Sequence, residues 1–133
     1  MSLAMMGRHE SLRVRVALTC YVICFTIGVL SHGHDFLTYG WRPYRWGSIP
    51  LEMFWTSLIL LDVSVVALLL IGRRRSGLLA AFTIMILDVA ANSYALFGMG
   101  IEAFARNLVM QSAFFGFVVG SIAFVWPRSQ ALD

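Results

Sequence analysis

The sequence predicts an all-α integral membrane protein, a four-helix bundle with both termini in the cytoplasm. The chain is 59% hydrophobic and only 13% charged, with a mean hydropathy of +0.79, whereas soluble domains carry about 25% charged residues. Four apolar stretches each reach about 20 residues, the length that crosses a hydrocarbon core of roughly 30 Å. We expect spans near 14–36, 50–71, 77–97 and 103–126, so that residues 1–133 form a single transmembrane domain.

The distribution of the arginines predicts the orientation of the bundle. All ten cations are arginine. Three lie on the side of the loop between the first two spans, namely Arg42, Arg45 and Arg106. The other seven lie on the side of the termini: Arg8, Arg13, Arg15, Arg73, Arg74, Arg75 and Arg128. Because the richer side faces the cytoplasm, we expect a multi-pass protein of a bacterial inner (plasma) membrane, whose arginines anchor helix ends at the lipid bilayer and bind no nucleic acid.

The first span carries small residues at four-residue intervals, Cys20, Cys24 and Gly28. Small residues on one face let helices pack closely within a membrane. The two cysteines of one regular helix point along its axis, so we interpret them as packing residues in preference to a redox pair. A basic start before an apolar run also resembles a secretory signal, but no small-residue cleavage site follows, and we expect an uncleaved span.

The loop at 37–49 combines aromatic residues with arginines. It holds Tyr39, Trp41, Tyr44 and Trp46 together with Arg42 and Arg45. This composition is typical of an aromatic belt, in which the rings lie at headgroup depth and the guanidinium groups contact lipid phosphates. The alternative interpretation is a lid over a cavity that opens outward.

One aspartate lies near the middle of the second span and one near the middle of the third, Asp62 and Asp88. A carboxylate at the bilayer centre costs roughly 2.5–3.5 kcal/mol on insertion scales, so both should face the bundle interior and mark a functional site. Ala81, Asp88 and Ala95 lie seven residues apart with Asn92 one turn beyond Asp88, which places these residues in one helix seam.

The fourth span carries a ridge of small residues, Ser112, Gly116 and Gly120. Such a ridge is typical of close helix packing. It predicts contact with another helix of the bundle, or an interface to a second copy of the chain or to a larger membrane complex.

The polar residues form a column in the outer half of the bundle. At a rise of 1.5 Å per residue, Asp62 and Asp88 both lie roughly 17 Å deep. We expect them to form the floor of the column and Asn92 and Gln111 to lie midway. The candidate ligand-binding residues are therefore Asp62, Asp88, Asn92, Gln111, His32, Asp35 and Glu52, with the last three at the mouth.

His32, His34, Asp35 and Glu52 also raise the question of a metal site. They converge only if the helix unwinds at Gly33, and their spacing matches no strong metal motif, so we predict no metal site. The sequence identifies no cofactor.

The favoured function is the binding of a small amphipathic or cationic ligand, or a lipid, in an outward-facing pocket floored by the two aspartates. An alternative is a non-catalytic accessory subunit of a larger membrane complex, in which the acids hold helices together. A proton-coupled carrier, or an isomerase that acts on a membrane-dissolved substrate, is a third class. The residues do not decide whether the protein is an enzyme.

Overall fold

The computed structural model describes residues 10–127, and these form four long helices. The helices are α1 (Leu12–Tyr39), α2 (Ile49–Leu70), α3 (Arg74–Ser93), which continues into a π-helical turn η2 (Tyr94–Gly98), and α4 (Phe104–Val125). Each is long and apolar enough to cross a membrane when α3 and η2 are taken together. The predicted all-α, four-span, multi-pass fold is confirmed. Arg8 and Arg128 lie outside the described residues, and the cytoplasmic location of the termini stays a prediction.

The first helix is longer than the predicted span. It has 28 residues, about 42 Å, and includes the polar segment up to Tyr39 because backbone hydrogen bonding does not require apolar side chains. It ends at Gly40, whose φ of 82° suits glycine and whose N–H donates to the Phe36 carbonyl at 3.0 Å. The loop is therefore shorter than expected, and α2 begins after Ser48 with Pro50 in its first turn.

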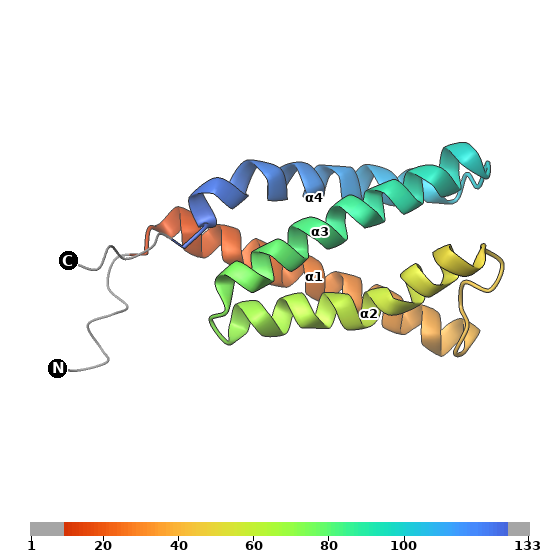
Figure 1. Ribbon diagram of the computed structural model, residues 1–133, viewed down its shortest axis with the longest axis horizontal. Helices are drawn as coiled ribbons and strands as arrows, with labels where there is room; N and C mark the ends of the chain where they lie inside the picture. Colours follow the sequence, from red (N-terminus) through yellow and green to blue (C-terminus); the bar gives the residue numbers. More distant parts are fainter. Residues whose placement is uncertain (1–9, 128–133) are drawn as a thin grey trace.

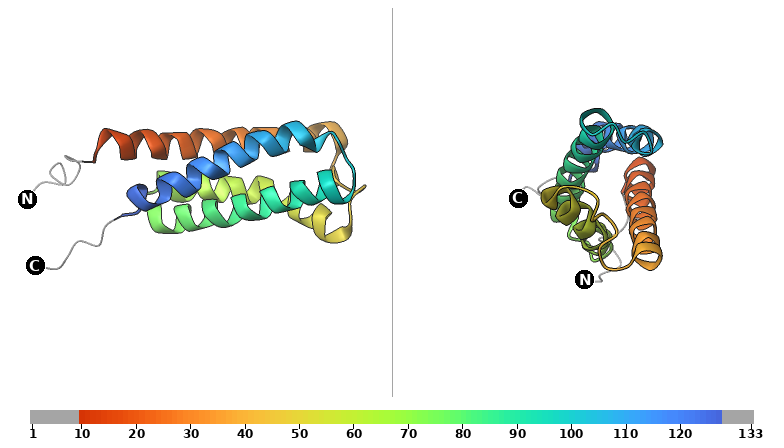
Figure 2. Two further views of the ribbon diagram at one scale, coloured as in Figure 1. Left: turned by 90° about the horizontal axis from the view of Figure 1, so that it is seen from above. Right: turned by 90° about the vertical axis from the view of Figure 1, so that its right-hand side faces the viewer.

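Consecutive helices run in opposite directions, so the start of α1, the α2–α3 turn and the end of α4 lie at one end of the bundle (Figures 1 and 2). We call this the inner end, and the end that carries loops 40–48 and 99–103 the outer end. At the inner end, the pair formed by α1 and α2 lies close to the pair formed by α3 and α4. Towards the outer end α1 and α4 diverge, as Figure 1 shows.

Buried residues recur every three or four positions along the helices, which is the spacing of one helix face. On α3 they include Leu78, Ala81, Met85, Asp88 and Asn92, continued by Ala95 in η2, and on α2 they are Glu52, Trp55, Leu58, Asp62 and Val65. The predicted seam of α3 is confirmed. This face is apolar near the inner end and polar near the outer end, so the same packing pattern that builds the core also brings the aspartates inside.

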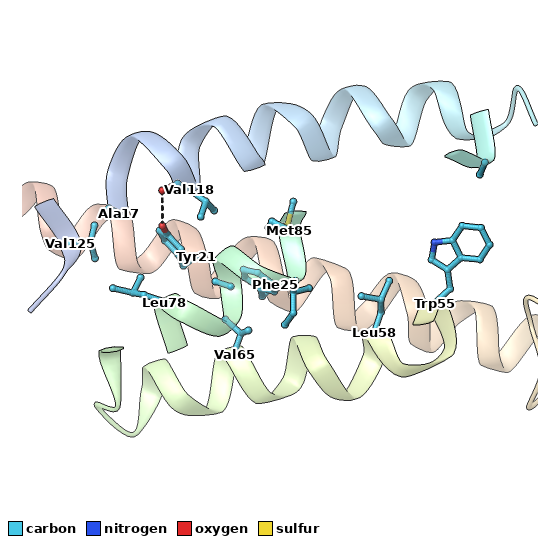
Figure 3. Packing of buried hydrophobic residues seen from close by; sticks show 13 residues of the cluster. Ala17, Tyr21, Phe25, Trp55, Leu58, Val65, Leu78, Met85, Val118 and Val125 are labelled. Carbon is cyan, nitrogen blue, oxygen red and sulfur yellow. Dashed lines mark hydrogen bonds between the residues drawn. The ribbon is translucent and has the colours of Figure 1, made fainter. Parts of the chain in front are cut away.

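Tyr21 joins α1 to α4 near the inner end (Figure 3). Its side chain is completely buried. Its hydroxyl donates to the Val118 carbonyl at 3.2 Å and lies 3.1 Å from the Ser121 hydroxyl. Its ring packs against Phe114 and Phe117, with centroids 6.1 and 5.6 Å away. This contact holds the inner halves of α1 and α4 together.

The two expected small-residue ridges differ in what they contact. A Cβ built on Gly28 of α1 would overlap the carboxylate oxygen of Asp62, so a larger residue here would force that carboxyl group to shift. Ser112, Gly116 and Gly120 of α4 are exposed, and a Cβ on either glycine would meet nothing within 4 Å. Among residues 10–127, no atom lies where a side chain on either glycine of the α4 ridge would be, so the first interpretation, contact with another helix of the bundle, is not supported at these glycines. An interface with another chain stays a prediction.

Replacing Gly28 by Ala tests the close approach of α1 to Asp62. The added methyl displaces the carboxyl group, so we expect the free energy of unfolding to fall by about 1–3 kcal/mol, as for other overpacked interiors. The measurement is reversible unfolding in mixed micelles. Gly116→Ala is the matched control and should leave stability unchanged or raise it by up to about 1 kcal/mol. Equal losses in both variants would contradict the assignment.

Replacing Tyr21 by Phe tests the contact between α1 and α4. The variant keeps the ring and removes the hydroxyl, so we expect a loss of roughly 0.5–1.5 kcal/mol in the free energy of unfolding. Tyr94→Phe, at a site that is 58% exposed, should cost nothing measurable in the same assay. Unchanged stability of Tyr21→Phe would show that the hydroxyl does not hold the two helices together.

Candidate functional site: a polar cavity between the outer halves of the helices

A cavity of about 380 Å³ lies between the outer halves of the four helices. All four helices and Tyr44 of the α1–α2 loop line it. Six of the seven residues predicted to bind a ligand are in its wall: His32, Asp35, Asp62, Asp88, Asn92 and Gln111. Side chains from four segments distant in the sequence thus meet in one place.

The cavity opens between α1 and α4. Its exposed lining residues are Ile27 and Ser31 of α1 and Asn107 and Met110 of α4. Its inner side is closed where Phe25 packs edge-on against Phe114, with ring centroids 5.5 Å apart. The exposed part of the lining is therefore on the side of the bundle, beyond the aromatic contact that holds α1 and α4 together. The expected opening towards the outer aqueous side stays a prediction.

An aromatic stack covers the outer end of α2 and α4. The rings of Trp46, Trp55 and Phe104 lie 5.2–5.9 Å apart, centroid to centroid. Trp55 is only 2% exposed, and its indole N–H donates to the Asn92 Oδ1 at 3.0 Å. Trp46 of the loop therefore packs on Trp55 and Phe104, two residues of the cavity wall.

A hydrogen-bonded chain runs along the α1 wall of the cavity. The Tyr44 hydroxyl donates to the Asp35 Oδ2 at 2.6 Å and lies 2.9 Å from the His32 Nδ1. Because a hydroxyl has one proton and Tyr44 gives it to Asp35, its oxygen accepts a hydrogen bond from Nδ1–H of His32. A neutral His32 then presents the lone pair of Nε2 towards the Asp62 Oδ2, which lies 3.9 Å away.

Tyr44 remains protonated in this setting. Burial raises the pKa of its hydroxyl well above the ordinary value, and the hydrogen bond to Asp35 and the negative charges of Asp35 and Asp88 raise it further. The hydroxyl therefore donates to one neighbour and accepts from the other, and it links His32 to Asp35 without becoming a phenolate.

A second network surrounds Asp88. The Asn92 amide donates to the Asp88 Oδ1 at 3.3 Å and to the Gln111 side-chain carbonyl, and it accepts from Trp55. The side-chain nitrogen of Asn92 thus acts only as a donor and its side-chain oxygen as an acceptor, which fixes the orientation of the amide. This network ties α3 to α2 and α4 on the wall opposite His32.

Glu52, expected at the mouth of the pocket, does not line the cavity. Its carboxylate is bound by Arg42, with Nε 2.7 Å from Oε1 and a terminal nitrogen 2.8 Å from Oε2. The hydrogen bonds and the charge of Glu52 raise the pKa of Arg42. Arg42 thus attaches the loop to α2. Its contact with lipid phosphates stays a prediction, and because it lies two residues before Tyr44, we expect its bond to Glu52 to help position Tyr44.

The four residues considered for a metal site do not converge. The His34 Nε2 lies 3.4 Å from the Thr38 hydroxyl, and Glu52 is bound by Arg42. In the part of the chain that the structure describes, no group of three or more His, Cys, Asp or Glu side chains is arranged to hold a metal ion.

Sequence reasoning missed the roles of Tyr44 and Trp55. Both resemble ordinary interfacial aromatics in the sequence, and Tyr44 is nine residues from the Asp35 that it contacts. The available signal was the burial of Trp55, which follows from its spacing of seven residues from Asp62 on α2.

Comparison of the chain with models of known protein families, with curated proteins and with solved structures finds no match. What the cavity does must therefore be inferred from its own side chains.

Replacing Arg42 by Gln tests whether the bond to Glu52 positions the loop. We expect the Gly47 amide, which donates to the Tyr44 carbonyl at 2.9 Å, to exchange severalfold faster with deuterium because the loop opens more often. Hydrogen exchange followed by mass spectrometry measures this rate. Arg45→Gln, in the same loop at an exposed position, is the control. Equal exchange in both variants would remove Arg42 from this role.

Proposed function

We propose that the protein binds a small amphipathic cation that enters the cavity from the outer leaflet of the membrane. The observation that carries this proposal is a cavity that has two interior carboxyl groups on its wall and opens sideways between two membrane-spanning helices. We further propose a bacterial-type plasma membrane, with the arginine-rich inner end in the cytoplasm.

The lining of the cavity is divided as an amphipathic ligand requires. The polar part of the lining includes Asp62, Asp88 and Asn92, and the rest of the lining is mainly apolar. The apolar lining includes Phe25, Ile84, Met85, Met110 and Phe114. A volume of about 380 Å³ is within the range of small-molecule sites.

The charges of the lining favour a cation. Asp35, Asp62 and Asp88 lie in the wall, whereas no arginine of the described residues does. A cationic headgroup would pair with the carboxylates in a low-dielectric setting, where such pairing is stronger than in water. An anionic ligand would meet repulsion and a buried carboxylate with no partner.

The sideways opening fits a ligand dissolved in the membrane. Ile27 and Met110 at the opening are 60% and 69% exposed, on helix surfaces that face lipid in a spanning bundle. Ser31 and Asn107 lie beside them and provide polar contacts for a headgroup. An apolar tail can thus remain in the lipid while the headgroup reaches the aspartates.

A role as an accessory subunit is the second candidate, and the α4 ridge favours it. One face of α4 exposes only small side chains at Ser112, Gly116 and Gly120. Small residues allow close packing against a helix of another chain. This role is compatible with ligand binding, because the ridge residues do not line the cavity.

Replacing Asp62 or Asp88 by Asn tests the proposal. With dodecyltrimethylammonium as the probe, each variant should bind about 10- to 100-fold more weakly, because a charged pair is replaced by a neutral contact. Native mass spectrometry of protein in nanodiscs measures the bound fraction. Glu102→Gln, an exposed acid outside the cavity, is the control and should bind as the unmodified protein does.

Dodecanol, which has the same tail and no charge, separates recognition of the headgroup from tail binding. The proposal predicts weaker binding of dodecanol than of the cation, and no effect of either aspartate substitution on dodecanol. If the cation binds equally to the unmodified protein and to both variants, the aspartates do not form its site.

A further inference from the structure

We infer that Asp62, His32, Tyr44 and Asp35 form a proton path from the interior of the cavity to its outer mouth, so that a cation binding at Asp62 expels a proton outward. The path itself rests on the hydrogen-bond geometry. Its coupling to ligand binding rests on the proposed function.

The path has a direction because each of its hydrogen bonds has a defined donor. Tyr44 donates its one proton to Asp35, so its oxygen accepts from Nδ1–H of His32, which lies 2.9 Å away. The free lone pair of His32 is on Nε2, which is the atom nearest to Asp62 along the path. When a proton binds at Nε2, a different proton can therefore leave the path at Asp35.

The transfer is balanced step by step. The O–H bond of a protonated Asp62 breaks as the Nε2–H bond of His32 forms. The Nδ1–H bond of His32 breaks as a new O–H bond forms on Tyr44, and the original O–H bond of Tyr44 breaks as Asp35 becomes protonated. Asp35 then gives its proton to water at the outer end. One proton leaves, and Asp62 becomes a carboxylate that pairs with the cation.

The side chains of Asp62 and His32 must come closer together, or be bridged by a water, before a proton can pass between them. The distance of 3.9 Å between Nε2 and Oδ2 exceeds a hydrogen bond by about 1 Å. A small shift of the Asp62 side chain or one bridging water would close it. When the cation leaves, a proton retraces the path from Asp35 to Asp62, which restores the first tautomer of His32 and completes the cycle.

The surroundings of His32 favour this role. The acidic groups that line the same cavity come from three helices: Asp35 on α1, Asp62 on α2 and Asp88 on α3. No titratable side chain of α4 lines the cavity among the described residues, and Arg42 of the loop is bound to Glu52. The path therefore runs between carboxyl groups without a fixed positive charge in the cavity wall.

The first test is the tautomer of His32, which needs no ligand. Nitrogen-15 NMR of labelled protein in nanodiscs at a pH where His32 is neutral should show the proton on Nδ1. Tyr44→Phe removes the acceptor and should abolish this preference, whereas Tyr39→Phe, 69% exposed and outside the cavity, should not. A proton fixed on Nε2 in the unmodified protein would overturn the path.

The second test is the rate at which protons appear outside when dodecyltrimethylammonium binds. Stopped-flow mixing with a pH-sensitive dye measures this rate beside the rate of binding. At equal amounts of bound probe, Tyr44→Phe should release its proton about 10²-fold more slowly than the unmodified protein, as for the loss of a positioned proton-transfer group. Tyr39→Phe is again the control.

Asp35→Asn gives an independent variant in case Tyr44→Phe misfolds. The side-chain carbonyl of the introduced asparagine still accepts from Tyr44 but cannot take up the proton, so release should slow as it does in Tyr44→Phe. Release at the unmodified rate in a folded variant would overturn the path while leaving ligand binding intact. If the unmodified protein does not bind the probe, the proposed function fails, and the tautomer of His32 still decides the path.

Discussion

Two carboxyl groups within a membrane bundle impose the main constraint on this structure. Asp62 and Asp88 belong to the interior faces of α2 and α3, at the spacing that otherwise places leucine, valine and alanine there. Exposure of these carboxyl groups to lipid would cost free energy, and alkyl side chains cannot form hydrogen bonds with the carboxyl oxygens. Their neighbours are accordingly polar, with Asn92 and Gln111 beside Asp88 and His32 near Asp62. The close approach at Gly28 brings α1 over Asp62 and completes this interior.

Aromatic side chains decide where the interior is open. Near the inner end, Tyr21 and Phe25 pack against the aromatic residues of α4 and close the bundle. At the outer end, Trp46, Trp55 and Phe104 close the side formed by α2 and α4. The exposed part of the cavity wall lies between α1 and α4, at Ile27, Ser31, Asn107 and Met110. The same residue class thus supplies both the packing of the bundle and the shape of the cavity.

The α1–α2 loop is as much a part of the cavity as the helices are. Arg42 attaches it to Glu52, and two residues later the Tyr44 hydroxyl lies between Asp35 and His32. A loop at the membrane surface would otherwise be free to move with the headgroups. Here it positions a hydroxyl that connects a residue of the cavity wall to a carboxylate near the outer end, which is the basis of the inferred proton path.

The sequence alone determined the helices and the interior position of the aspartates, because hydrophobic length and helical periodicity are local properties that a bilayer enforces strongly. It also identified six polar residues that meet in one cavity, since depth in the membrane follows from the rise per residue. The sideways opening, the bond between Arg42 and Glu52, and the contact of Tyr44 with Asp35 and His32 were decided by the tertiary structure. They depend on how helices cross and how a loop folds back, and neither is encoded by periodicity within a single span.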